Sequence, residues 1–122
     1  MGYRDLIHTM QQKAGFSDAE AEEALDLMVE SIAERLEDDE RKDFASQLPA
    51  ELQEVALGIE MADREERRED LIHEFMEKEG INEDHAKKQV MTAWETLKSF
   101  ITEGQIRHIK AQMSAPAADL LH

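Results

Sequence analysis

The sequence predicts an all-α fold, and three observations carry this prediction. Apolar residues recur at steps of three and four, the spacing that places them on one face of a helix. No segment alternates apolar and polar residues over the length of a strand, and five glycines and two prolines among 122 residues leave room for long helices. Because this length fits one domain, we expect residues 1–122 to form a single helical bundle.

An internal duplication organises the predicted bundle. Residues 4–57 align with residues 69–122 without a gap. We call the displacement that brings residue 4 onto residue 69 the repeat offset. The run DLIH at 5–8 then meets the same run at 70–73. Half a chain of this size buries its own apolar stripe poorly, so repeats of this kind pack on one another. We therefore expect two tandem repeats of three to four helices each, packed with pseudo-two-fold symmetry. Repeat one spans residues 3–57, the connector spans 58–68 and repeat two spans 69–122.

The first helix of each repeat ends at a glycine. This helix is predicted over residues 3–14 in repeat one and over 64–79 in repeat two, where residues 63–66 form a capping box. Gly15 and Gly80 follow, at the position where a left-handed residue ends a helix and glycine has no Cβ to strain. The sequence leaves open whether the connector is continuous with its neighbouring helices.

The second helix is the longest of each repeat. It begins after Ser17 in repeat one and after Asn82 in repeat two, because these side chains can accept hydrogen bonds from the free amides of a first turn. It is predicted to end near Leu36 and near Ile101. One apolar stripe runs along each copy, made of Ala21, Leu25, Met28, Val29, Ile32 and Leu36 in the first and of Ala86, Val90, Ala93, Trp94, Leu97 and Ile101 in the second.

The third and fourth helices are shorter. The third is predicted over residues 39–47 and 104–113, and each copy is followed by a proline, Pro49 or Pro116. Proline is tolerated in the first turn of a helix because its missing N–H has no intrahelical partner there. We therefore expect these two prolines to open a fourth helix in each repeat.

Charge is the strongest signal in the composition. There are 14 Lys and Arg against 29 Asp and Glu, which gives a net charge of −15 and a pI near 4.6. Such a surface repels phosphates, which argues against non-specific nucleic-acid binding and against an anionic membrane. The absence of cysteine excludes disulfides, thiolate catalysis and sulfur-ligated zinc. No apolar run approaches the ~18 residues of a membrane span, so we expect a cytoplasmic protein.

Three short runs resemble a known family. They read YRDLI at 3–7, AERL at 33–36 and ASQLPAEL at 45–52, and with them the chain resembles the bacterial domain-of-unknown-function family 2267 (DUF2267). The resemblance covers nearly the whole chain, although the third run is degenerate in repeat two, where QMSAPA stands at 112–117. It implies a small all-helical protein with this duplicated arrangement. The family carries no assigned activity or catalytic residues, so the resemblance leaves the function open.

One repeated pattern has the spacing of metal ligands. Asp5 with His8, and Asp70 with His73, place a carboxylate and an imidazole three residues apart on a helix, and four-helix iron proteins use a related pair that projects inward. A helical wheel at ~100° per residue instead directs Asp5 and His8 away from the apolar face. We therefore expect these four residues on a solvated surface, with a metal-binding protein as the alternative function.

No motif of an enzyme is present. Ser17, Ser46 and Ser114 fall at predicted caps or turns, and none lies in a glycine-flanked nucleophile elbow. Paired carboxylates are too abundant to single out an acid and a base, so we expect no enzymatic activity and no cofactor. His108 is predicted on an exposed helix face. The six methionines after Met1 share helical spacing with leucine and isoleucine and are predicted as core.

The negative charge is uneven between the halves. Residues 1–61 hold 5 basic and 16 acidic groups, net −11, whereas residues 62–122 hold 9 and 13, net −4. The carboxylates of the first repeat's second helix and the run after it are expected to form the most negative surface. General solubility or adaptation to a salty cytoplasm is the favoured explanation, and recognition of a basic partner, for example by mimicry of nucleic acid, is the other. The candidate partner-binding residues are Glu22, Asp26, Glu37, Asp38, Asp39 and Glu40.

These observations predict a non-enzymatic protein-interaction or stress-associated accessory module. Its acidic first repeat would bind an unidentified protein partner by docking of helix surfaces. The oligomeric state stays open, because an apolar stripe that faces the sister repeat and one that faces a second chain leave the same pattern. A homodimer, including a domain-swapped one, is compatible with the sequence.

Overall fold

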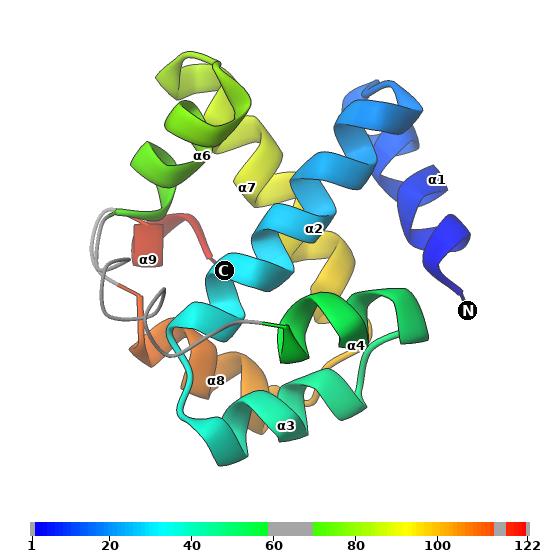
Figure 1. Ribbon diagram of the computed structural model, residues 1–122. Helices are drawn as coiled ribbons and strands as arrows, with labels where there is room; N and C mark the ends of the chain where they lie inside the picture. Colours follow the sequence, from blue (N-terminus) through cyan, green and yellow to red (C-terminus); the bar gives the residue numbers. More distant parts are fainter. Residues whose placement is uncertain (1, 59–69, 114–116, 122) are drawn as a thin grey trace.

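The computed structural model describes residues 2–58, 70–113 and 117–121. Within these residues the chain is all-α and contains no strand, which confirms the predicted fold class. The helices of the first half are α1 (Tyr3–Ala14), α2 (Asp18–Glu34), α3 (Asp38–Ser46) and α4 (Ala50–Leu57), and those of the second half are α6 (Leu71–Glu79), α7 (Glu83–Lys98), α8 (Glu103–Ala111) and α9 (Ala117–Leu120) (Figure 1).

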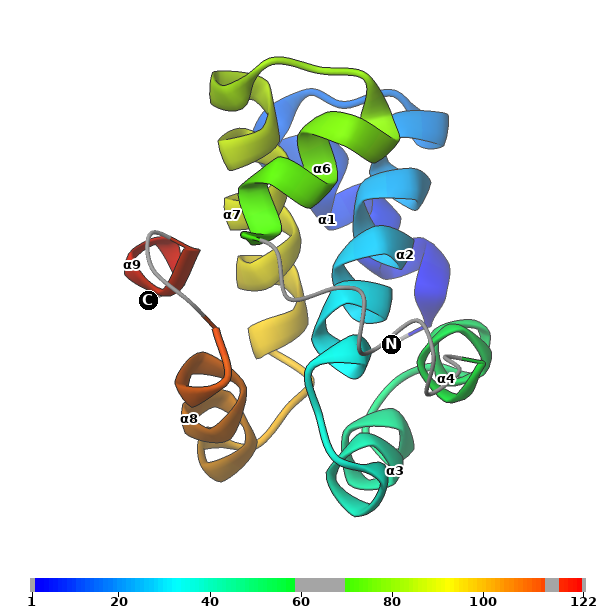
Figure 2. The ribbon, with the colours of Figure 1, turned by 60° about the vertical axis from the view of Figure 1, so that its left-hand side comes forward.

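The two longest helices, α2 and α7, cross at the centre of the molecule (Figure 1). Both α1 and α6 contact this central pair, and α4 packs against α2 and α3. In the view turned by 60°, α3, α4 and α8 lie below the ends of α2 and α7 (Figure 2). The central helices are therefore covered on more than one side.

The core follows the two apolar stripes that the sequence predicts. Every residue of both stripes is buried, and the largest fully buried side chains include Trp94, Phe44 and Phe75. Removing such apolar surface from water contributes about 25 cal/mol per Å², so the burial of the two stripes stabilises the fold. Trp94 and Val29 correspond under the repeat offset, and both are buried.

The predicted caps at the loop between the first two helices of each half are confirmed. Gly15 and Gly80 have φ values of 72° and 64°, the left-handed region that favours glycine. The Ser17 hydroxyl oxygen accepts a hydrogen bond from the Glu20 N–H at 3.2 Å. Asn82 Oδ1 accepts one from the N–H three residues later at 2.9 Å. These polar side chains fix where α2 and α7 begin.

The predicted helix over 64–79 does not run through Asp70 as one helix. α6 begins at Leu71, and the Asp70 carboxylate accepts a hydrogen bond from the Ile72 N–H at 3.4 Å. A carboxylate in this position satisfies a free first-turn amide and so marks the start of the helix. The predicted start at residue 64, the predicted capping box at 63–66 and the connector beyond Gly58 lie outside the described residues.

The ends of α2 and α7 come two and three residues before their predicted positions. Each last turn tightens: the Leu36 N–H donates to the Ala33 carbonyl at 3.2 Å, and the Phe100 N–H donates to the Leu97 carbonyl at 2.9 Å. Such i to i−3 bonds satisfy terminal carbonyls and stop the α-helical ladder. The last residue of each apolar stripe, Leu36 or Ile101, therefore lies just beyond the end of its helix.

The short helices start close to their predicted positions. α3 and α8 each begin one residue early, and α4 begins at Ala50 with Pro49 as its N-cap rather than as its first helical residue. Pro116 lies outside the described residues. The starts of α2 and α7 correspond under the repeat offset, and so do both the starts and the ends of α3 and α8.

No helix within residues 2–58, 70–113 and 117–121 combines the length and the apolar character needed to cross a bilayer.

Candidate functional site

The predicted acidic residues fall into two groups, the first of which lies against α1. The Arg4 guanidinium donates to Glu22 Oε1 at 2.9 Å, and the Tyr3 hydroxyl donates to Asp26 Oδ1 at 3.1 Å. Burial raises the pKa of Asp26, and the nearby carboxylate of Glu22 raises it further. Burial and the neighbouring Asp26 likewise raise the pKa of Tyr3. Glu22 and Asp26 thus hold the first turn of α1 on α2.

The second acidic group lies where α3 begins. Glu37 is the N-cap of α3, and the three following carboxylates form its first turn. Glu37, Asp38 and Asp39 are exposed, whereas Glu40 is half-buried. The Asp38 carboxylate pairs with Arg41 at 2.5 Å. About 12 Å of α2 separates Asp26 from the end of that helix, so the six candidates form two surfaces rather than one.

One carboxylate of the expected acidic surface is buried, which corrects the sequence-based interpretation of α2. Glu34 is 1% exposed, and Glu74 of α6 is 4% exposed. Arg35 Nη1 lies 3.4 Å from Glu74 Oε1 and also donates to the Ser31 carbonyl at 2.8 Å. Lys78 Nζ lies 3.7 Å from the second oxygen of Glu74. Because α6 packs on α2, charges on that side of α2 are enclosed and paired.

The candidate metal ligands have other tasks or point into solvent. Asp5 Oδ2 accepts a hydrogen bond from the Gly2 N–H at 3.0 Å, and Asp70 caps α6. His8 and His73 are exposed, as the helical wheel predicts. In the part of the chain that the structure describes, no group of three or more His, Cys, Asp or Glu residues is placed to hold a metal ion.

Two histidine–glutamate pairs join the halves, and the sequence analysis did not anticipate them. His85 Nε2 contacts Glu20 Oε2, and His108 Nε2 contacts Glu40 Oε2. The sequence predicts His108 on an exposed helix face, and its side chain is 40% accessible, although α8 turns the ring toward Glu40 of α3. A signal was present, since Glu20 and His85 correspond under the repeat offset. Residues 40 and 105 also correspond, and the Gln105 amide donates to the Glu40 carbonyl at 3.5 Å.

The pair of His85 and Glu20 belongs to a larger polar cluster. The Gln89 amide donates to Glu20 Oε2 at 2.9 Å, and the Phe16 ring stacks on His85 with centroids 6.2 Å apart. Burial alone would raise the pKa of Glu20, but the hydrogen bonds from Gln89 and His85 outweigh it and hold the pKa below its ordinary value. Nearby, burial together with neighbouring carboxylates raises the pKa of Glu79.

Two ion pairs also cross between the halves, and they are reciprocal in sequence. Lys13 Nζ lies 3.2 Å from Glu95 Oε2, and Lys78 Nζ lies 3.0 Å from Glu30 Oε1. The two lysines correspond under the repeat offset, and so do the two glutamates. Each half therefore offers its lysine to the glutamate of the other half.

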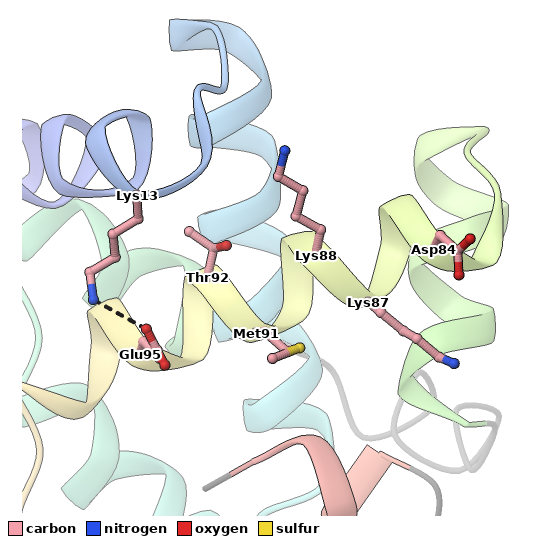
Figure 3. A pocket seen from close by; sticks show the side chains of 7 residues that line it. All are labelled: Lys13, Asp84, Lys87, Lys88, Met91, Thr92 and Glu95. Atoms are coloured by element: carbon pink, nitrogen blue, oxygen red, sulfur yellow. Dashed lines mark hydrogen bonds and ion pairs between the residues drawn. The ribbon is translucent and has the colours of Figure 1, made fainter.

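An open hollow lies along the outer face of α7 (Figure 3). Met91 on this face is 41% exposed, so the prediction that every methionine after Met1 is core is wrong for this residue. Lys87 pairs with Glu83 at 3.4 Å, and Lys88 Nζ lies 5.4 Å from the centre of the Phe16 ring. The lining residues are Lys13 from α1 and Asp84, Lys87, Lys88, Met91, Thr92 and Glu95 from α7.

Comparison with known families decides where the chain belongs. The model of the family described as an uncharacterized conserved protein (DUF2267) matches residues 3–120, from the start of α1 to the end of α9. The chain belongs to this family. No curated protein and no solved structure matches it. The DUF2267 resemblance of the three sequence runs is thereby confirmed.

The groups with shifted pKa and the hollow on α7 lie apart on this DUF2267 chain. Among the described residues, the groups with clearly shifted pKa are Tyr3, Glu20, Asp26 and Glu79, and none of them lines the hollow on α7. An active site gathers such groups in one concave place. Here the shifted groups hold helices together, while the hollow exposes lysine and methionine to solvent.

Proposed function

We propose that this DUF2267 protein is a non-enzymatic interaction module of the bacterial cytoplasm that binds a basic protein partner through the acidic face of its first half. The observation that carries the proposal is the exposed run of Glu37, Asp38 and Asp39 at the start of α3. The other candidates hold internal contacts: Glu40 follows this run on α3, whereas Glu22 and Asp26 form the separate surface on α2.

Electrostatics supports docking at this face. A first-turn carboxylate stabilises its own helix through the macrodipole, but consecutive carboxylates also repel one another and raise the local negative potential. A partner with lysine or arginine would relieve that repulsion and would be steered to the surface, with an association rate that falls as salt rises. A salt-sensitive, basic partner is therefore the expected occupant.

Charge neutralisation tests this proposal. The triple variant Glu37→Gln, Asp38→Asn, Asp39→Asn changes the net charge from −15 to −12. Its control removes three exposed carboxylates of the second half, Glu77→Gln, Glu103→Gln and Asp119→Asn, and also reaches −12. We expect the wild type and the control to retain a lysate protein at about 0.05 M salt and to release it at about 0.3 M, where the Debye length is shorter. The first variant should fail to retain it.

A folding control and the outcome that would contradict the proposal complete this experiment. Circular dichroism of both variants checks that α3 still forms, because each lost charge costs its first turn about 0.3 to 1 kcal/mol. If both folded variants retain the same proteins, or if no retained protein responds to salt, the acidic face of α3 is not the docking surface.

We also infer that the chain is a tandem duplication whose halves pack with pseudo-two-fold symmetry. The reciprocal ion pairs, Lys13 with Glu95 and Lys78 with Glu30, support it. In a two-fold interface residue i meets j and j meets i, and residues near the axis meet their own counterparts. Glu20 with His85 fits the second rule. The helix starts that correspond under the repeat offset support it too.

A further inference from the structure

Two large apolar side chains are exposed among the described residues, one beside carboxylates and the other among lysines and carboxylates. Leu57, at the end of α4, is 52% exposed, and Met91, in the middle of α7, is 41% exposed. The exposed carboxylates of Glu51 and Glu54 precede Leu57 on α4. Three lysines and two carboxylates line the hollow around Met91. One surface is thus apolar with an acidic border, and the other is apolar with a mixed border in which lysines outnumber carboxylates by one.

The hollow around Met91 can accept a helix surface. Lys87 and Lys88 leave α7 in different directions one turn before Met91, and Lys13 approaches from the end of α1 (Figure 3). The lysines have partners, but these pairs are exposed: the side chains of Lys13 and Glu95 are 43% and 55% accessible. Exposed ion pairs contribute little and exchange partners readily. An incoming carboxylate can therefore share these lysines.

The surface of α4 has the complementary pattern. Glu54 and Leu57 are three residues apart and therefore lie on one side of this helix. Glu51 stands one turn before Glu54, and Ala50 beside them is small and exposed. An apolar side chain with carboxylates one and two turns before it fits a hollow that has a methionine between lysines.

We propose that the hollow on α7 binds α4 of a second copy of this chain. Leu57 of one molecule packs on Met91 of the next, and Glu54 and Glu51 approach Lys87 and Lys88. Each molecule carries both surfaces, so two copies can exchange them reciprocally in a closed two-fold dimer, or a single contact can leave one free surface at each end for further addition. The net charge of −15 opposes assembly, but at physiological salt the Debye length of about 8 Å leaves mainly the local contact.

This inference is independent of the partner proposed for the acidic face of α3. It uses α4 and α7, and it needs no residue between Glu37 and Glu40. A failure of self-association would therefore leave the proposed function untouched. The reverse also holds, because the triple variant at residues 37–39 alters neither surface of the contact between α4 and α7.

Sedimentation equilibrium of the whole chain, at concentrations up to about 1 mM, tests the association. We expect the average mass of the wild type to rise with concentration to at least the mass of a dimer. Leu57→Gln and Met91→Gln should each weaken the association constant by about tenfold, because each replaces an apolar anchor. Leu57 and Met91 are exposed in the single chain, so these variants should keep its thermal stability.

A charge exchange separates this contact from general electrostatics. Glu54→Lys gives one molecule two basic surfaces, and Lys87→Glu weakens the basic surface of another, so neither variant should assemble alone. An equimolar mixture should assemble, because the lysine introduced on α4 meets the glutamate introduced on α7 in one junction and the original surfaces meet in the other. Lys42→Glu and Glu77→Lys, both at exposed positions, change the net charge equally and should leave assembly as it is in the wild type.

Four results would overturn the proposal. A wild type that stays monomeric to about 1 mM shows that the hollow does not take a second copy. An association constant that neither Leu57→Gln nor Met91→Gln weakens shows a contact elsewhere. Two separately monomeric variants that do not assemble when mixed show that α4 is not the occupant. If an acidic helical peptide shifts the NMR signals of α7 in a monomeric protein, the occupant is a foreign helix.

Discussion

The corresponding faces of α2 and α7 show how one helical scaffold serves two purposes. On α2, Glu22 and Asp26 are met by the first turn of α1, through Arg4 and Tyr3. Their counterparts on α7 under the repeat offset are Lys87 and Met91, which line an open hollow. The two first helices differ in turn, because α6 begins at Leu71, about one turn after the counterpart of the start of α1. The face of α2 is thus closed by its own chain, while the face of α7 is left to solvent.

The largest expected change in stability is at the core positions 29 and 94, which correspond on α2 and α7. Trp94 is 1% exposed and Val29 is fully buried, at corresponding places on α7 and α2. Trp94→Ala should lower the free energy of unfolding by about 3 to 5 kcal/mol, because it leaves a large cavity, and Val29→Ala by roughly 1 to 3 kcal/mol. Urea unfolding followed by circular dichroism measures both. Equal losses would show that the two helices contribute equally in spite of their different side chains.

The contact between the first turn of α1 and α2 provides the next test. Tyr3→Phe removes the hydroxyl that donates to the half-buried Asp26, and should cost about 1 kcal/mol of unfolding free energy. Met91→Leu, at the position on α7 that corresponds to Asp26, should change it by less than about 0.5 kcal/mol, because the side chain is exposed. The same urea titration compares them. A loss at Met91 as large as that at Tyr3 would contradict the difference between the covered and the open face.

Two carboxyls of one cluster should respond to pH in opposite ways. Glu79 has a raised pKa, so its protonation stabilises the fold; this contribution is present below the ordinary pKa of about 4.3 and is lost as pH rises. Glu20 has a lowered pKa, so its contribution is present above the ordinary pKa and is lost as pH falls. At pH 7 we therefore expect Glu79→Gln to raise and Glu20→Gln to lower the midpoint of thermal unfolding.

The pH profile provides the control for this pair of variants. Both differences from the wild type should shrink as pH falls toward about 3, where the wild-type carboxyls become protonated and resemble glutamine. Differences of constant size from pH 7 to pH 3 would show that the two substitutions act through packing rather than through charge.

Local features of this fold could be predicted from the sequence, because they depend on neighbouring residues. The left-handed glycines, Gly15 and Gly80, and the caps at Ser17 and Asn82 need only their own turns, and the apolar stripes need only helical periodicity. The end of α2 was missed by two residues because a tighter last turn and a continued α-helix have similar sequences.

Features that depend on which helix covers which face could not be predicted in the same way. Glu34 looks like a solvated carboxylate on its own helix and becomes buried only because α6 lies there. Met91 has helical spacing with core residues, yet its side of α7 is open. The contact of Glu20 with His85 was accessible in principle, since a pseudo-two-fold arrangement brings corresponding residues together near its axis, and the repeat offset marks this pair.

The reciprocal ion pairs give the smallest expected effect and the most direct comparison of the two halves. The side chains of Lys78 and Glu30 are 29% and 34% exposed, against 43% and 55% for Lys13 and Glu95. Exposed pairs contribute about 0.2 to 1 kcal/mol, and less water around a pair strengthens it. Double-mutant cycles with alanine should therefore give a favourable coupling energy for both pairs, larger for Lys78 with Glu30. A favourable coupling energy at only one pair would contradict reciprocal packing. Favourable coupling energies of different size at both pairs would show the same lysine–glutamate arrangement in two places with different burial.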